Sequence, residues 1–170
     1  MSVPVVHIVD DDDEMRIAIA RLLRAEGYEV RLYESAGHFL LAPPEDGPGC
    51  VVLDLQMPGP SGLDLQQALQ RHPTPLPIVF VTGRGDIASS VRAMKAGAVD
   101  FLTKPVEPQT LLKAIDVAIA RDRSVRASRE QMKAIEAHYA SLTERERSVF
   151  DHVVAGKLNK QIGDTLGISE

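Results

Sequence analysis

Five short apolar runs alternate with helical segments along residues 1–120, and this alternation constrains the fold more than any other feature. The runs predict strands at Val5–Val9, Glu29–Tyr33, Cys50–Leu55, Ile78–Thr82 and Val99–Leu102. Stretches such as VVLDL and IVFVT are apolar on both faces, as strands between two helix layers must be. Helical periodicity lies between them, roughly at Glu14–Arg24, Ala36–Leu41, Gly62–Gln70, Asp86–Ala96 and Pro108–Arg121. The pattern predicts an α/β fold: a doubly wound, five-stranded parallel sheet with helices on both faces and right-handed crossovers.

Composition excludes several classes of protein. The 170 residues are 44% hydrophobic and 25% charged, the usual mix of a globular chain and unlike a disordered or fibrous one. Cys50 is the single cysteine, which excludes an internal disulfide framework and a cysteine zinc cluster and fits a reducing cytoplasm. Neither a membrane-spanning apolar stretch nor an export signal is visible in the sequence. We therefore expect a cytoplasmic protein with no membrane partner.

Charge is distributed unevenly along the chain. Residues 1–120 hold ten basic and sixteen acidic residues, whereas residues 121–170 hold nine basic and eight acidic residues. This shift indicates two modules with different partners, although the slight positive excess of the second is too small to mark a nucleic-acid surface by itself.

The sequence after residue 122 predicts a linker helix and then two short helices. RDRSVRASREQMKAIEAHYA contains neither Pro nor Gly and can extend the fifth helix. Val125, Met132 and Tyr139 recur every seven residues, with Ile135 and Leu142 on a second seam that Arg121 and Ser128 interrupt. A solvated connector and a dimerising coiled coil both remain open.

The next helix is expected after Ser141 or Thr143 as N-cap, with Gly156 as its stop. A second helix is expected at Leu158–Leu166, ended by Gly167. Two short helices joined by a glycine turn predict a helix-turn-helix.

Several polar residues lie where strands of the expected sheet end. Asp10–Asp13 follow the first strand, Asp54 lies near the end of the third, and Thr82 and Lys104 lie at the ends of the fourth and fifth. Because ligands of an open α/β sheet bind outside the carboxyl ends of its strands, these side chains define a candidate site.

The residue types at this site suit phosphoryl transfer to a carboxylate. Clustered carboxylates with no Cys or His favour a hard cation such as Mg²⁺. One of the carboxylates can then attack phosphorus, while a Lys ammonium and a Thr hydroxyl bind the phosphoryl oxygens. Alternatively, the acidic run is a solvated helix start. A phosphatase would need a second acid where Gln56 stands, and no complete nucleotide-binding glycine motif is present.

The segments HIVDDDDEMR, VVLDLQMPGPSG, IVFVTGRGD and AMKAGAVDFLTKP together resemble the receiver domain of two-component response regulators, which has a flavodoxin-like fold. The resemblance covers about residues 3–122. It implies the following roles: Asp54 as phosphoacceptor, Asp10, Asp11, Asp54 and the backbone carbonyl of Gln56 as Mg²⁺ ligands, Thr82 and Lys104 as sensors of the phosphoryl group, and Phe101 as the switch residue. It also implies a cis Lys104–Pro105 bond. The extra acid, Asp12, departs mildly from the family pattern and suggests a further, water-mediated metal contact.

The tail LTERERSVFDHVVAGKLNKQIGDTLGISE resembles the start of the LuxR-type DNA-binding domain of FixJ/NarL response regulators. In that family the helix that reads bases follows at once, at about Ser169, so we expect a truncated domain without base-specific binding. Arg145, Arg147, Lys157 and Lys160 are expected to be solvated, with phosphate contacts as the alternative.

The resemblance implies three parts: a receiver at residues 1–122, a linker helix at 123–140 and a partial helix-turn-helix at 141–170. It implies phosphorylation of Asp54 by a partner histidine kinase, which controls homodimerisation and, in the full-length protein, promoter DNA binding. The chain would not be an enzyme beyond accepting the phosphoryl group and losing it slowly. The alternative is an adaptor that acts only through phosphorylation-dependent protein contacts.

Overall fold

The computed structural model describes residues 3–44 and 46–167. The expected start of a further helix at about Ser169 lies outside these residues. The chain divides into two compact units, the first ending at Arg126 and the second beginning at Ala127.

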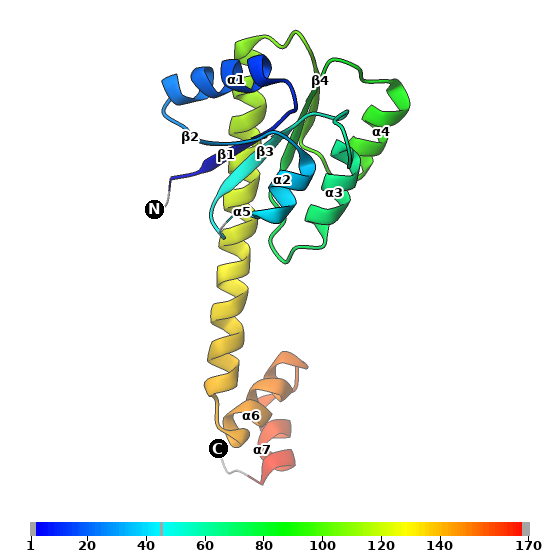
Figure 1. Cartoon of the computed structure of the whole chain (residues 1–170). Helices are drawn as coiled ribbons and strands as arrows, with labels where there is room; N and C mark the ends of the chain where they lie inside the picture. Colours follow the sequence, from blue (N-terminus) through cyan, green and yellow to red (C-terminus); the bar gives the residue numbers. More distant parts are fainter. Residues whose placement is uncertain (1–2, 45, 168–170) are drawn as a thin grey trace. The chain divides into compact units, whose positions relative to one another are not determined.

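The first unit is built on a five-stranded parallel sheet, as the sequence predicted. Its strands are β1 (Val5–Val9), β2 (Glu29–Tyr33), β3 (Gly49–Leu53), β4 (Ile78–Thr82) and β5 (Asp100–Thr103). They are ordered β2-β1-β3-β4-β5 (Figure 1). The chain therefore adds β2 on one side of β1 and the later strands on the other side, so that the order of addition reverses between β1 and β3. β3 is shorter than the expected Cys50–Leu55, because its pairing with β1 ends where Val9 meets Leu53. Asp54 thus begins the loop at the carboxyl edge of the sheet.

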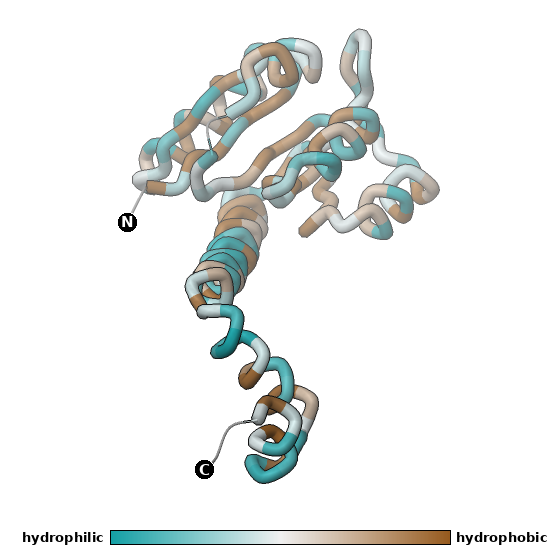
Figure 2. Tube along the Cα trace, turned by 90° about the horizontal axis from the view of Figure 1, so that it is seen from below, coloured by the Kyte–Doolittle hydropathy of each residue, from teal (hydrophilic) through white to brown (hydrophobic). Residues whose placement is uncertain are grey.

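Helices cover both faces of this sheet (Figure 1). They are α1 (Asp13–Ala25), α2 (Ala36–Leu41), α3 (Gly62–Gln70), α4 (Ile87–Lys95) and α5 (Pro108–Ser141). α1 and α5 pack on one face against alternate strand residues such as Val6 and Ile8. α2, α3 and α4 pack on the other, around Phe39 and Phe80. The inner strands β1, β3 and β4 are almost wholly buried and mostly hydrophobic, as burial on both faces requires, whereas the edge strand β2 alternates exposed and less exposed residues. Figure 2 shows long hydrophobic stretches within the first unit.

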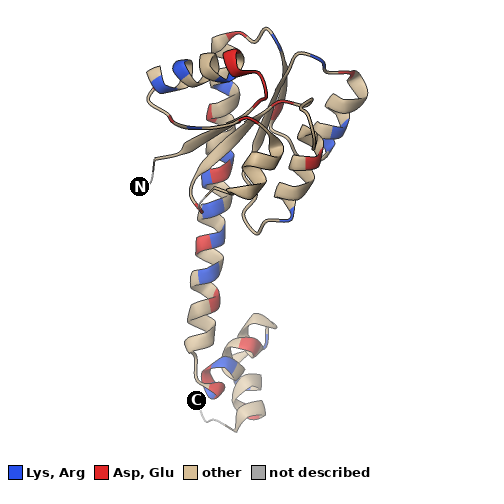
Figure 3. Ribbon diagram, viewed as in Figure 1, with Lys and Arg blue, Asp and Glu red and all other residues tan. Residues whose placement is uncertain are grey.

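Helix α5 runs without a break from Pro108 to Ser141, so the expected linker helix extends the fifth helix of the receiver, as the sequence allowed. Its buried residues end with Asp122, and beyond that point both basic and acidic residues are distributed along it (Figure 3). The helix continues because residues 109–141 contain no Pro or Gly to stop it. Val125, Met132 and Ile135 of the heptad pattern are exposed. None of the described helices combines the length and the apolar character that crossing a bilayer requires.

The second unit contains the end of α5 and two short helices, α6 (Glu144–Val154) and α7 (Asn159–Leu166). Thr143 caps α6 through a reciprocal pair of hydrogen bonds with Glu146. α7 ends at Gly167, whose φ of 65° is the left-handed conformation that glycine adopts easily. The helix pair expected from the sequence is therefore present within the described residues.

Tyr139 joins the end of α5 to α6. Its ring lies 5.6 Å from that of Phe150, and its hydroxyl donates to Asp151 at 3.0 Å. The guanidinium of Arg147 lies over the Tyr139 ring at 5.1 Å and donates to backbone carbonyls of α5 and the turn after it. Arg147 is therefore not the solvated charge the sequence suggested, because its side chain packs against an aromatic ring.

Candidate functional site

The acidic loop after β1 forms one wall of the site. Asp10 is 2% exposed, and its carboxylate accepts a hydrogen bond from the Asp12 backbone N–H at 2.9 Å. Asp12 caps α1 by accepting from the Met15 N–H at 3.1 Å. One Asp12 oxygen therefore caps the helix, while the residue also lines the cavity in front of the site. Asp11 is exposed between them.

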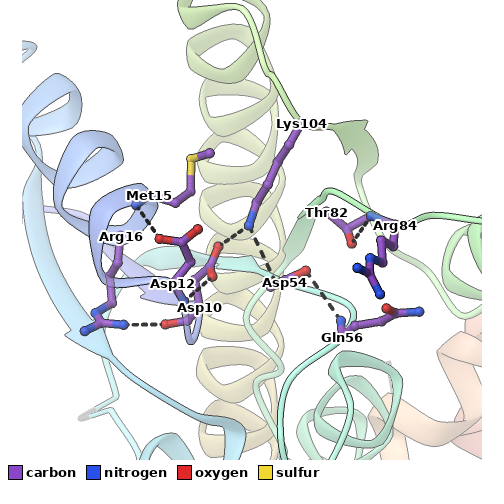
Figure 4. A network of polar contacts seen from close by, with 9 residues as sticks. All are labelled: Asp10, Asp12, Met15, Arg16, Asp54, Gln56, Thr82, Arg84 and Lys104. Carbon is purple, nitrogen blue, oxygen red and sulfur yellow. Dashed lines mark hydrogen bonds and ion pairs between the residues drawn. The ribbon is translucent and has the colours of Figure 1, made fainter.

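Asp54 lies beside this loop because β3 is the neighbour of β1. The Asp54 backbone N–H donates to the carbonyl of Val9 at 2.9 Å, which holds the ends of the two strands together. The Asp54 side chain is largely buried, and one of its oxygens accepts a long bond from the Gln56 N–H at 3.4 Å. The loop after β3 thus presents a single carboxylate toward the acidic loop (Figure 4).

Lys104, which follows β5, links the two carboxylates. Its Nζ lies 2.7 Å from an Asp10 oxygen and 3.6 Å from an Asp54 oxygen (Figure 4). The backbone of Lys104 donates to the carbonyl of Thr82 at 2.8 Å, and its bond to Pro105 is cis. The ammonium therefore compensates two neighbouring negative charges that would otherwise repel each other.

Burial and mutual attraction shift the pKa values of Asp10 and Lys104. Burial raises the pKa of the Asp10 carboxyl above its ordinary value, and the hydrogen bond from Lys104 offsets part of that rise. Burial acts to lower the pKa of Lys104, but the attraction of Asp10 and Asp54 together outweighs it, so that pKa is raised. Lys104 therefore remains a cation at neutral pH.

Thr82 completes the site at the end of β4. It is 1% exposed, and its Oγ1 accepts a hydrogen bond from the Arg84 N–H at 3.3 Å. A cavity of about 450 Å³ lies in front of these groups. It is lined by Asp11, Asp12, Asp54, Gln56, Thr82, Gly83, Arg84 and Lys104. The structure thus brings together the predicted residues Asp11, Asp54, Gln56, Thr82 and Lys104 around the cavity, and Asp10 is bound to Lys104 beside it.

Phe101 lies on β5, half-buried and away from this cavity. Its ring is 5.8 Å from that of Phe80. A methyl group built on Gly85 would lie 2.7 Å from the Phe101 ring and 3.2 Å from the Thr82 methyl. Gly85 therefore lies in a narrow space between Phe101 and Thr82. Because this space is closely packed, a shift of the Thr82 side chain would change the room that is available to the Phe101 ring.

Three carboxylates of the site could hold a metal ion together. One oxygen from each of Asp10, Asp11 and Asp54 lies within 4.8 Å of the others. Opposite ligands of Mg²⁺ are roughly 4 Å apart, at about 2.0–2.1 Å from the ion each, so small side-chain movements would bring this set to the required distances. The all-oxygen donor set fits a hard cation.

Two arginines of the site were missed in the sequence. Arg16 donates to the Asp10 backbone carbonyl at 2.6 Å and pairs with Asp13, which holds the acidic loop in place. Arg84 brings a second cation to the cavity. The spacing of Arg16 after the acidic run was a usable signal, because it places the side chain one turn into the helix that the run begins.

Comparison with known families agrees with this geometry. The family model described as the response regulator receiver domain matches residues 6–116. A second model, described as bacterial regulatory proteins of the luxR family, matches residues 140–170. The first match covers the sheet except Val5, the first residue of β1, and all the site residues named above. The second covers α6 and α7.

Individual proteins are similar over nearly the whole chain. Nodulation protein W of Bradyrhizobium diazoefficiens is 42% identical over 98% of this chain and 73% of its own length. The transcriptional regulatory protein FixJ of the same species is 40% identical over 96% of this chain and 80% of its own length. Among solved structures, the response regulator StyR is 43% identical, with a TM-score of 0.88 over 99% of this chain and 85% of that one. The chain therefore belongs to the FixJ-like two-component response regulators, in which a receiver domain and a LuxR-type helix-turn-helix act together in the control of transcription.

Proposed function

We propose that Asp54 accepts a phosphoryl group from a partner histidine kinase. The observation that carries this proposal is the position of Lys104, whose ammonium lies 3.6 Å from Asp54 at the edge of the cavity. A phosphoryl group on Asp54 would add negative charge beside this cation. Thr82, at the same edge, supplies a hydroxyl donor for a second phosphoryl oxygen.

The proposal assigns the metal site to Asp10, Asp11, Asp54 and the backbone carbonyl of Gln56, with Mg²⁺ as the ion. When bound, Mg²⁺ supplies charge compensation for the attacking carboxylate and for the phosphoryl oxygens. Asp10 and Asp11 bind the ion, and Arg16 holds the loop that carries them. The chemistry of the oxygen ligands supports this assignment.

The transfer step itself uses the Asp54 carboxylate as nucleophile. One of its oxygens forms a bond to phosphorus as the phosphorus–nitrogen bond of a phosphohistidine breaks, and the electron pair and a proton remain with the imidazole. Water later attacks the phosphorus and releases phosphate, which makes the modification slowly reversible. The chain provides the acceptor and its surroundings, whereas the kinase provides the phosphoryl group.

The switch that follows is proposed to run from Thr82 to Phe101. A hydrogen bond to the phosphoryl group would draw the Thr82 side chain inward and change the space that Gly85 and the Phe101 ring share. A few kcal/mol of differential contact is enough to shift such a two-state equilibrium. The receiver would then form a homodimer and change promoter binding by the complete DNA-binding domain.

The proposed boundaries are 1–122 for the receiver, 123–140 for the linker and 141–170 for the helix-turn-helix segment. The cytoplasm is the proposed location, since the kinase's phosphotransfer domain and the promoter DNA are found there. The adaptor alternative is not favoured, because the luxR-family match over residues 140–170 adds a DNA-binding module.

Phosphorylation by a small phosphodonor tests the proposal. With acetyl phosphate and Mg²⁺, the intact mass should rise by one phosphoryl group that hydroxylamine removes. Asp54→Asn should abolish the increase, whereas the exposed control Glu29→Gln should leave it unchanged. Asp11→Ala should remove the rise in melting temperature that Mg²⁺ causes. Full labelling of Asp54→Asn would assign the acceptor elsewhere.

A further inference from the structure

A buried carboxylate interrupts the apolar face of α5. The residues that α5 buries are Leu111, Ala114, Ile115, Ala118, Ile119 and Asp122, spaced three or four apart as one helical stripe. The last member of the stripe is an aspartate that is only 4% exposed. A buried carboxylate is costly unless charged and hydrogen-bonding partners surround it, so its partners indicate what it does.

The partners of Asp122 come from both the sheet and the helix. One oxygen of Asp122 accepts from the Gly49 backbone N–H at 3.0 Å and from Arg126 Nε at 2.8 Å. A further nitrogen of Arg126 donates to Asp46 at 2.8 Å, and Asp46 accepts from the Thr74 hydroxyl at 3.3 Å. Asp122 and Gly49 are separated by 73 positions in the sequence, and Arg126 and Asp46 by 80 positions.

Gly49 links this network to the strand that bears the phosphoacceptor. It is the first residue of β3, and Asp54 follows the last residue of that strand. A methyl group on Gly49 would lie 2.2 Å from the Val5 carbonyl oxygen, so the backbone of β3 is closely packed against β1 at this point. The network therefore contacts a rigid strand at the edge of the sheet opposite to the acidic site.

We propose that Asp122 and Arg126 are positioning residues that fasten the first turns of the linker helix to the amino end of β3. The pair anchors α5 just past its last apolar contact with the sheet, and it makes the start of the linker respond to the state of the strand that carries Asp54. This second part rests on the proposed phosphorylation of Asp54. Without the pair, this part of α5 would lose the side-chain hydrogen bonds that tie it to Gly49 and Asp46, so local opening of its backbone hydrogen bonds would cost less free energy.

Hydrogen exchange of the full chain tests this role. The double variant Asp122→Leu/Arg126→Met removes both charges and continues the apolar stripe, a change that commonly preserves stability. Asp122→Asn alone is the second variant in case the double variant does not fold, because its amide oxygen can still accept from the Gly49 N–H while Arg126 keeps its ion pair with Asp46. Glu130→Leu/Lys133→Met is the matched control, since both residues are exposed on the same helix and their charges also cancel.

Amide exchange is measured over residues 119–130 before and after phosphorylation, with the phosphoryl content read from the intact mass. Phosphorylation should change exchange at residues 122–128 of the natural chain by about threefold or more. The double variant should exchange about tenfold faster there in both states, with unchanged phosphoryl uptake and no response to it. Absence of uptake in the natural chain would contradict the proposed function instead. Phosphorylated protein without a linker response, or a double variant that exchanges like the control, would overturn the positioning role.

Discussion

His7 makes the stability of the receiver sensitive to mild acid. It lies in the middle of β1, is 3% exposed, and its Nδ1 is 3.2 Å from the Tyr33 hydroxyl. The Phe39 ring packs edge-on against the imidazole at 5.9 Å. Burial, and secondarily the nearby charge of Arg31, lowers the pKa of His7 from 6.5 to about 4. The folded chain therefore keeps this imidazole neutral where the unfolded chain protonates it.

The size of the effect follows from the pKa difference. Below pH 6.5 the His7 imidazole takes up a proton in the unfolded state but stays neutral in the folded state, so the free energy of unfolding falls as the pH is lowered. The loss continues until the folded pKa of about 4 is reached. At about 1.4 kcal/mol per pH unit, the total is about 3 kcal/mol, all of it present above pH 6.5.

Urea unfolding between pH 7 and pH 4 measures this contribution. His7→Asn keeps a polar side chain beside Tyr33 but cannot titrate in this range. Between pH 7 and pH 4 the free energy of unfolding of this variant should therefore fall by about 3 kcal/mol less than that of the natural chain. His72→Asn is the control, because His72 is an exposed imidazole of the same unit. Carboxylates titrate equally in all three proteins and cancel in the comparison. Parallel pH profiles for His7→Asn and the natural chain would refute the buried neutral imidazole.

Two further substitutions test the site. Lys104→Met leaves Asp10 and Asp54 without their shared cation, so the free energy of unfolding should fall by about 3 kcal/mol in chelator and by less in millimolar Mg²⁺. Equal losses under both conditions in urea unfolding would contradict a metal between these carboxylates. Gly62→Ala places a methyl 2.3 Å from the Asp54 carbonyl oxygen, which must displace the loop beside the acceptor. The change should cost about 1–3 kcal/mol and slow phosphoryl uptake from acetyl phosphate, and an unchanged rate of uptake would show that this loop does not position Asp54.

The sheet and the site could be predicted because their signals are local. Mostly apolar runs such as IVFVT identify buried parallel strands, and Asp54, Thr82 and Lys104 each follow or end such a run. Parallel strands bring these positions to one edge whatever the details of packing. The limits of β3 could not be predicted, because they depend on its register with β1.

The contacts that the sequence did not reveal join distant residues. Asp122 looks like a surface charge in RDRSVR, and only the fold places it beside Gly49 and within the apolar stripe of α5. Arg147 likewise has the sequence pattern of a solvated charge, but its guanidinium lies over the Tyr139 ring. In both cases a polar residue is held by a partner from another element, and amphipathic periodicity alone carries no information about such partners.

The identity of the phosphoacceptor is the central claim, and borohydride trapping tests it most directly. Borohydride reduces an aspartyl phosphate to homoserine, so the modified position can be read from peptide masses after treatment with acetyl phosphate and Mg²⁺. The account predicts homoserine at position 54, and none at positions 10 and 11, because those carboxylates bind the metal. Homoserine at another aspartate, or phosphoryl uptake without any homoserine, would contradict it.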